Sequence, residues 1–80
     1  MTKQLRSKLE AGQQQDNNLL VPKDQAGNTL GHNPDYLDTE LGITKSDLIR
    51  LERGGMALKA RYDANGTHRT RWIIFKEALE

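Results

Sequence analysis

The stretch LGITKSDLIRLERGG, residues 41–55, carries start and stop signals for a short helix with two unlike faces. Thr44 is followed three residues later by Asp47, a spacing typical of a capping box, with the shorter Asp in place of the usual Glu. Leu48 and Leu51 lie three residues apart and predict an inward apolar stripe. The other face is mostly basic, and two glycines end the helix. We therefore expect one side of this helix to face a core and the other to face solvent or an anionic partner.

The helix in this stretch is expected to span residues 45–53. A second short helix is expected just before it. Asn33 can cap it and Pro34 suits its first turn, because proline there loses no needed hydrogen bond. Acidic side chains follow near the positive end of the helix dipole, and Gly42 ends the helix. Two short helices joined across a glycine-containing turn are typical of a helix-turn-helix.

The next stretch, MALKARYDANGTHRTRWIIF at residues 56–75, changes to strand periodicity. Asn65-Gly66 is the strongest short signal for a two-residue hairpin turn, because both central residues must adopt positive φ. The hairpin has an apolar base and a basic tip, and residues 75–80 predict a closing helical turn. The predicted cross-strand pairs are Ala64–Thr67, Tyr62–Arg69, Ala60–Arg71, Leu58–Ile73, Arg61–Thr70 and Lys59–Trp72.

Residues 1–33 are expected to form a flexible segment in front of a folded domain at residues 34–80. Apolar residues thin out there, and a polar GQQQDNN stretch and a run of turn signals follow one another. Leu5 and Leu9 suit a short helix, but two leucines cannot hold an isolated helix in water. The LLV run at residues 19–21 is expected either to pack back onto the domain or to bind a partner protein.

Length and composition limit the chain to one small domain. Eighty residues, of which 35% are apolar, leave much of the surface exposed. The sequence has no cysteine, which excludes disulfides and thiolate metal sites. The first residues lack the apolar run of a secretory signal, and no stretch approaches the length of a membrane span. We therefore expect a soluble, cytoplasmic protein with no membrane partner.

Charge is distributed unevenly, although the net charge is only +1. Residues 1–40 hold four Lys or Arg against six Asp or Glu, a balance of −2. Residues 41–80 hold eight against five, a balance of +3. The basic excess thus lies in the half that is expected to fold.

These features together resemble a known family. The sequence LGITKSDLIRLERGGMALKARY, followed by RTRWIIFKEALE, is similar to the excisionase and MerR-like winged helix-turn-helix proteins, and the resemblance covers residues 34–80. It implies a small α+β fold with two short helices, a β-hairpin wing and a short C-terminal helical turn. It also implies sequence-specific DNA binding, as a transcriptional regulator or a recombination directionality factor of a phage, plasmid or other mobile element.

The resemblance further implies which side chains meet double-stranded DNA. The recognition helix would enter the major groove, where Arg or Lys can bond guanine edges, and wing arginines would reach phosphates or the minor groove. One departure concerns Asp47, whose carboxylate would repel phosphate unless it is occupied as a cap. With the neighbouring basic residues included, the expected DNA-binding residues are Thr44, Lys45, Ser46, Arg50, Arg53, Lys59, Arg61, Arg69 and Arg71.

The partners expected beside DNA follow from the size of the domain. One such domain reads about half a DNA site, so a homodimer, adjacent copies on DNA or a recombinase would complete the interface. The alternative is a protein-protein interaction module or inhibitor with the same small fold, whose front segment folds on its partner. DNA binding should weaken with salt, whereas hydrophobic docking should hardly respond.

Metal binding and catalysis are not expected. His32 and His68 have no partner at metal-ligand spacing. There is no thiol and no glycine-rich phosphate loop, so we expect neither an enzyme nor a cofactor. Residues 30–55 also resemble the tail of a CoA-transferase family, but that likeness includes no catalytic part. Trp72 is interpreted as a core residue or a cover for the Lys59 stem rather than a base-stacking platform.

Overall fold

The computed structural model describes residues 2–80 as an α+β arrangement of short helices around a small sheet. A three-stranded sheet has the strand order β1-β3-β2, and two 3₁₀ helices connect or close the larger elements. The α-helices are α1 (Lys3–Gln15), α2 (Pro34–Leu41) and α3 (Lys45–Arg53), the strands are β1 (Leu20–Val21), β2 (Ala57–Ala64) and β3 (Thr67–Phe75), and the 3₁₀ helices are Lys23–Asn28 and Lys76–Leu79.

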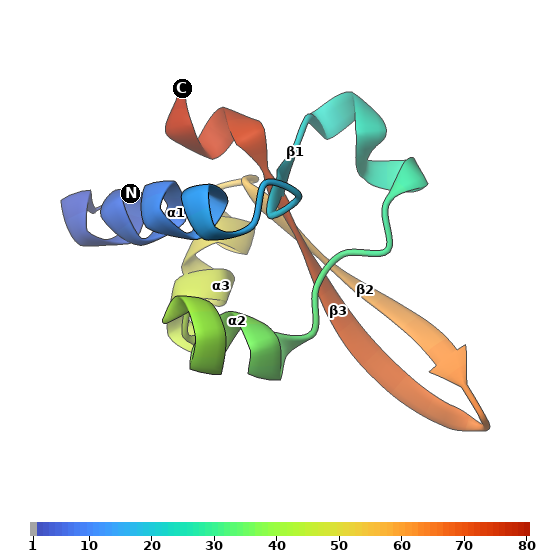
Figure 1. Ribbon diagram of the computed structural model, residues 1–80. Helices are drawn as coiled ribbons and strands as arrows, with labels where there is room; N and C mark the ends of the chain where they lie inside the picture. Colours follow the sequence, from blue (N-terminus) through green and yellow to red (C-terminus); the bar gives the residue numbers. More distant parts are fainter. Residues whose placement is uncertain (1) are drawn as a thin grey trace.

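The hairpin of β2 and β3 is the longest feature, and its tip extends well beyond the helices (Figure 1). Asn65 and Gly66 have φ values of 53° and 79°, as the Asn-Gly turn requires. The six cross-strand pairs expected from the sequence are all present in the antiparallel register. The predicted hairpin is therefore confirmed.

The two helices before the hairpin also begin and end as the sequence predicted. The Asn33 side chain accepts a hydrogen bond from the Asp35 amide at the start of α2, and Gly42 ends that helix with a φ of 70°. The α3 capping box is complete, since Thr44 and Asp47 each bond the other residue's backbone amide. Local sequence signals thus account for both helix boundaries.

The first 33 residues differ from the flexible segment expected from the sequence. Leu5 and Leu9 of α1 are only 1% and 0% exposed, and they belong to the same core as the hairpin base and α3. The physical reason is tertiary packing, which supplies the stability that two leucines alone lack. The core residues are Leu5, Leu9, Leu19, Leu20, Leu37, Ile43, Leu48, Leu51, Ala57, Trp72, Ile74 and Ala78.

The LLV run packs back onto the domain and adds a third strand to the sheet. Leu20 and Val21 of β1 pair in parallel with Ile74 and Phe75 of β3. Further along, His32 exchanges backbone hydrogen bonds of 2.7 and 2.8 Å with Trp72. The segment before α2 therefore follows the free edge of β3 and is tied to it.

Helix α1 is held against the rest of the molecule at several points. The Arg6 guanidinium donates to the Leu79 carbonyl at 2.5 Å, and the Tyr36 hydroxyl donates to Asp16 at 3.0 Å. At Gly12, an added Cβ would lie 2.7 Å from Leu19 Cδ2, so glycine permits the close approach of this segment. The N- and C-terminal elements lie at the same end of the molecule (Figure 1).

The whole arrangement is compatible with a small winged-helix-like domain, in which a helix pair precedes a protruding hairpin. Among the helices described for residues 2–80, none is long and apolar enough to cross a membrane.

Candidate nucleic-acid interface

The outer face of α3 carries two arginines beside a serine and an isoleucine. Ser46, Arg50 and Arg53 line a shallow surface hollow together with Ile49. This face lies opposite the buried stripe of α3, so its side chains point away from the core. Neither guanidinium forms an ion pair with a partner among residues 2–80. Both arginines can therefore meet an external anion.

Asp47 is the one buried charged side chain among the residues that the structure describes, with 8% exposure. Its carboxylate accepts hydrogen bonds from the Thr44 amide at 3.2 Å and from Lys8 Nζ at 2.9 Å. Burial raises the pKa of Asp47, but the bonds from Lys8 and Thr44 outweigh burial, and the pKa lies below its ordinary value. The carboxylate is thus occupied as a cap and balanced by a cation, which is the condition under which it would not repel phosphate.

Lys8 is a functional candidate that sequence reasoning missed. It belongs to α1 and reaches the first turn of α3 across a separation of 39 residues. No local spacing could reveal this pair, because it forms only when α1 packs on the domain. The charge at the start of α3 is therefore balanced by a residue outside α2, α3 and the hairpin.

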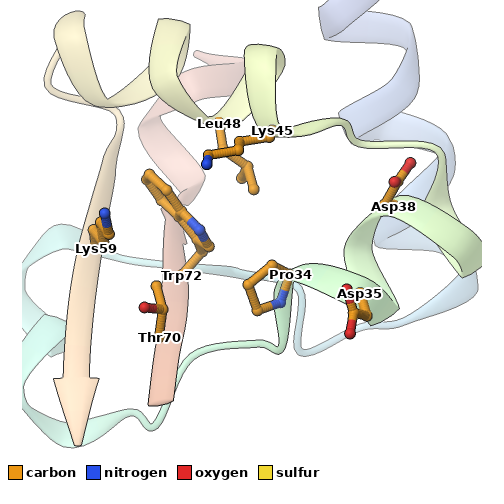
Figure 2. Close-up of a pocket in the computed structure, with 8 residues that line it drawn as sticks. All are labelled: Pro34, Asp35, Asp38, Lys45, Leu48, Lys59, Thr70 and Trp72. Atoms are coloured by element: carbon orange, nitrogen blue, oxygen red, sulfur yellow. The ribbon is translucent and has the colours of Figure 1, made fainter. Parts of the chain in front are cut away.

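Thr44 and Lys45 lie at the start of α3 in different environments. The Thr44 hydroxyl accepts the Asp47 amide at 3.3 Å, so its oxygen already acts as a cap. Lys45 lines a hollow between α2, α3 and the hairpin, together with Lys59 of β2. In Figure 2, the two lysines flank the Trp72 indole, which is a buried core side chain as the sequence suggested.

The same hollow also contains acidic side chains. Asp35 and Asp38 of α2 lie on the side away from Lys59 (Figure 2). These carboxylates oppose an approaching phosphate, so Lys45 and Lys59 are weaker candidates for phosphate contacts than the outer arginines of α3. This arrangement was not predictable from the sequence, in which Asp35 and Asp38 were interpreted only as charges at a helix start.

The hairpin arginines are divided between two faces and two roles. Strand alternation places Arg61 beside Thr70 on the face of Trp72, while Arg69 and Arg71 lie on the opposite face with Tyr62. Arg71 Nε and Nη2 donate to the carbonyls of residues 30 and 31, each at 2.9 Å. Its guanidinium also lies 5.7 Å from the centre of the Tyr62 ring.

Arg71 therefore differs from its expected role as a free wing arginine. Its bonds clamp the loop before α2 onto the hairpin, and fewer of its N–H groups remain for phosphate. Arg61 and Arg69 have no such bond within residues 2–80 and are exposed. They carry the exposed positive charge near the hairpin tip.

The tip of the hairpin contains an acid-histidine pair. Asp63 and His68 face each other in the register, and Asp63 Oδ1 lies 2.7 Å from His68 Nδ1. Both side chains are exposed, as expected for a pair near the turn. Within the described part of the chain, no group of three or more His, Cys, Asp or Glu side chains could hold a metal ion.

Seven of the nine expected site residues thus fall into three groups, while Thr44 caps α3 and Arg71 bonds loop carbonyls. Ser46, Arg50 and Arg53 share the outer face of α3, Lys45 and Lys59 share the mixed hollow, and Arg61 and Arg69 extend along the hairpin. Comparison with known proteins adds nothing to this geometry, because no family model, curated protein or solved structure matches the chain.

Proposed function

We propose that the chain binds double-stranded DNA without catalysing a reaction, as a small winged helix-turn-helix regulator or recombination directionality factor of a mobile element. The observation that carries the proposal is the outer face of α3, where Arg50 and Arg53 line a hollow with Ser46 and Ile49 and have no ion-pair partner among residues 2–80. The acid in the first turn of that helix, Asp47, is buried and paired with Lys8. A helix with this face suits the major groove.

The residues have distinct proposed roles in this complex. Arg50 and Arg53 contact guanine edges or flanking phosphates, and the Ser46 hydroxyl contacts a phosphate at the helix start. Arg61 and Arg69 of the hairpin contact phosphates or the minor groove beside the helix. Lys45 and Lys59 contribute less, because carboxylates of α2 share their hollow.

The experiment is a fluorescence-anisotropy titration of the chain with random duplex DNA. A variant with Arg50→Glu and Arg69→Glu should lose binding, because two proposed contacts become repulsive. A matched control, Lys3→Glu with Lys76→Glu, changes the net charge equally at exposed positions outside the interface. Equal binding by the charge-reversal variant and the parent would refute the proposal, whereas equal losses in both double variants would show only a net-charge effect.

A second candidate is a protein-interaction module, favoured by the exposed apolar side chains. Leu30 is 82% exposed although Arg71 fixes the carbonyl of that residue, and Leu58 and Tyr62 are also exposed on the hairpin. Tyrosine and arginine are enriched in protein interfaces. In that case, Leu30→Ser would abolish partner binding while binding to DNA stayed absent at low salt.

A further inference from the structure

The hollow between α2, α3 and the hairpin combines an apolar lining with charges of both signs. Its volume of about 400 Å³ lies in the range of small-molecule sites. Leu48 and Trp72, both buried, supply apolar lining from α3 and β3. Lys45 and Lys59 flank the indole, and the carboxylate of Asp38 lies on the α2 side (Figure 2).

The four charged side chains around this hollow are two lysines and two aspartates. The ion pairs found among residues 2–80 include none of its four charged side chains, which are Lys45, Lys59, Asp35 and Asp38. A bound anion would be attracted by the lysines and repelled by the carboxylates, and a bound cation would meet the reverse. A ligand that carries both charges can place its negative group beside the lysines and its positive group beside the carboxylates. Both contacts then favour binding.

We propose that the hollow binds a small zwitterion in which an apolar chain separates a carboxylate from an ammonium group. The carboxylate accepts hydrogen bonds from Lys45 and Lys59, and the ammonium donates to the two carboxylates of α2. The apolar chain between them packs on Leu48 and the edge of Trp72. This proposal does not rest on the proposed DNA binding, because the ligand is recognised in the absence of DNA, although Lys45 and Lys59 belong to both sites.

The test is a titration of the full, isotope-labelled chain with ε-aminocaproate, followed by two-dimensional NMR. The indole N–H of Trp72 is a specific reporter because the sequence has one tryptophan. A saturable shift of this signal is expected, with caproate and hexylamine, which each carry one of the two charges, binding about tenfold more weakly or worse. Absence of a saturable shift, or equal binding by either one-charge analogue, would overturn the proposal.

Charge-neutral variants identify the walls of the site. Lys59→Gln and Asp38→Asn should each weaken ε-aminocaproate binding by about tenfold, the effect of losing one charge-assisted hydrogen bond. The matched controls Lys3→Gln and Asp24→Asn alter exposed charges outside the hollow and should leave binding unchanged. The spectrum of each variant also shows whether it is folded, so a lost interaction is separable from a lost fold. Undiminished binding by both wall variants would overturn the proposal.

Discussion

Asp47 occupies an unusual position, because a carboxylate at the start of a candidate DNA-reading helix would ordinarily oppose the phosphate backbone. In this chain the side chain turns inward, caps α3 and pairs with Lys8 of α1. The positive end of the α3 dipole and the Lys8 ammonium both stabilise this carboxylate. The outer face of α3 carries Arg50 and Arg53.

The lowered pKa of Asp47 predicts how stability depends on pH. The ionised form is preferred in the folded state, so its contribution is present above the unfolded pKa of about 3.9 and is lost as pH falls through the lower folded pKa. The difference in free energy of unfolding between the parent and Asp47→Asn should therefore be largest near neutral pH and shrink in acid. Urea unfolding across a pH series measures it, and a difference that stayed constant would contradict the assignment.

Lys8 should affect DNA binding without touching DNA, if the proposed function holds. Lys8→Met leaves Asp47 uncompensated at the start of α3 and should weaken binding about fivefold, equivalent to roughly 1 kcal/mol of added repulsion. Adding Asp47→Asn should restore most of the loss. Lys3→Met is the matched control, since it removes a charge from the same helix. Anisotropy titration of the parent and these three variants measures the effect, and failure of the double variant to recover would show a merely structural role.

Residue-level features were predictable from the sequence only where the partners are close along the chain. The Thr44–Asp47 capping box follows from local spacing. The position of Asp63 opposite His68 follows from the hairpin register. The Lys8–Asp47 pair does not, because it depends on where α1 packs. The Arg71 clamp likewise joins residues about 40 positions apart and has no local signature.

Among the elements, α1 shows most clearly how packing overrides local propensity. The sequence predicted only a marginal helix here. In the structure, Leu5 and Leu9 of this helix are buried in the core. The bonds of Arg6 and Lys8 add polar attachment to the end of the chain and to α3. The N-terminal helix is therefore a structural part of the domain.

Truncating a leucine of α1 tests this attachment. Leu9→Ala should lower the free energy of unfolding by about 2–5 kcal/mol, because it leaves a cavity at a fully buried site. Leu30→Ala makes the same chemical change at an exposed position and should shift stability by less than about 0.5 kcal/mol. Denaturant unfolding compares the two variants. A negligible loss for Leu9→Ala would mean that α1 is a loosely attached arm.

The hairpin turn provides a second test at the level of elements. Gly66 has a φ of 79°, a conformation in which an L side chain is strained, so Gly66→Ala should cost about 1 kcal/mol of stability. Gly27 has no positive φ and no neighbour within 4 Å of an added Cβ, and Gly27→Ala should cost nothing. Thermal unfolding of both variants checks the expectation. Equal effects would show that the turn conformation does not limit stability.

At the scale of the whole molecule, the sequence predicted the helix pair and hairpin of residues 34–80 but not the extent of the core. The helix boundaries and strand register depend on neighbours in the chain, so capping, glycine and alternation signals were sufficient. The packing of α1 and β1 depends on distant partners and left only isolated leucines in the sequence. For the same reason, the sequence could not show that Asp35 and Asp38 share a hollow with Lys45 and Lys59.

The two candidate functions differ most in their response to salt, which reports on the whole charged surface. The measurement that tests the central proposal most directly is the affinity of the full chain for duplex DNA across a series of salt concentrations. With about five phosphate contacts, the log–log slope should lie near −4 to −5. No binding at low salt, or binding that hardly changes with salt, would contradict DNA recognition by α3 and the hairpin.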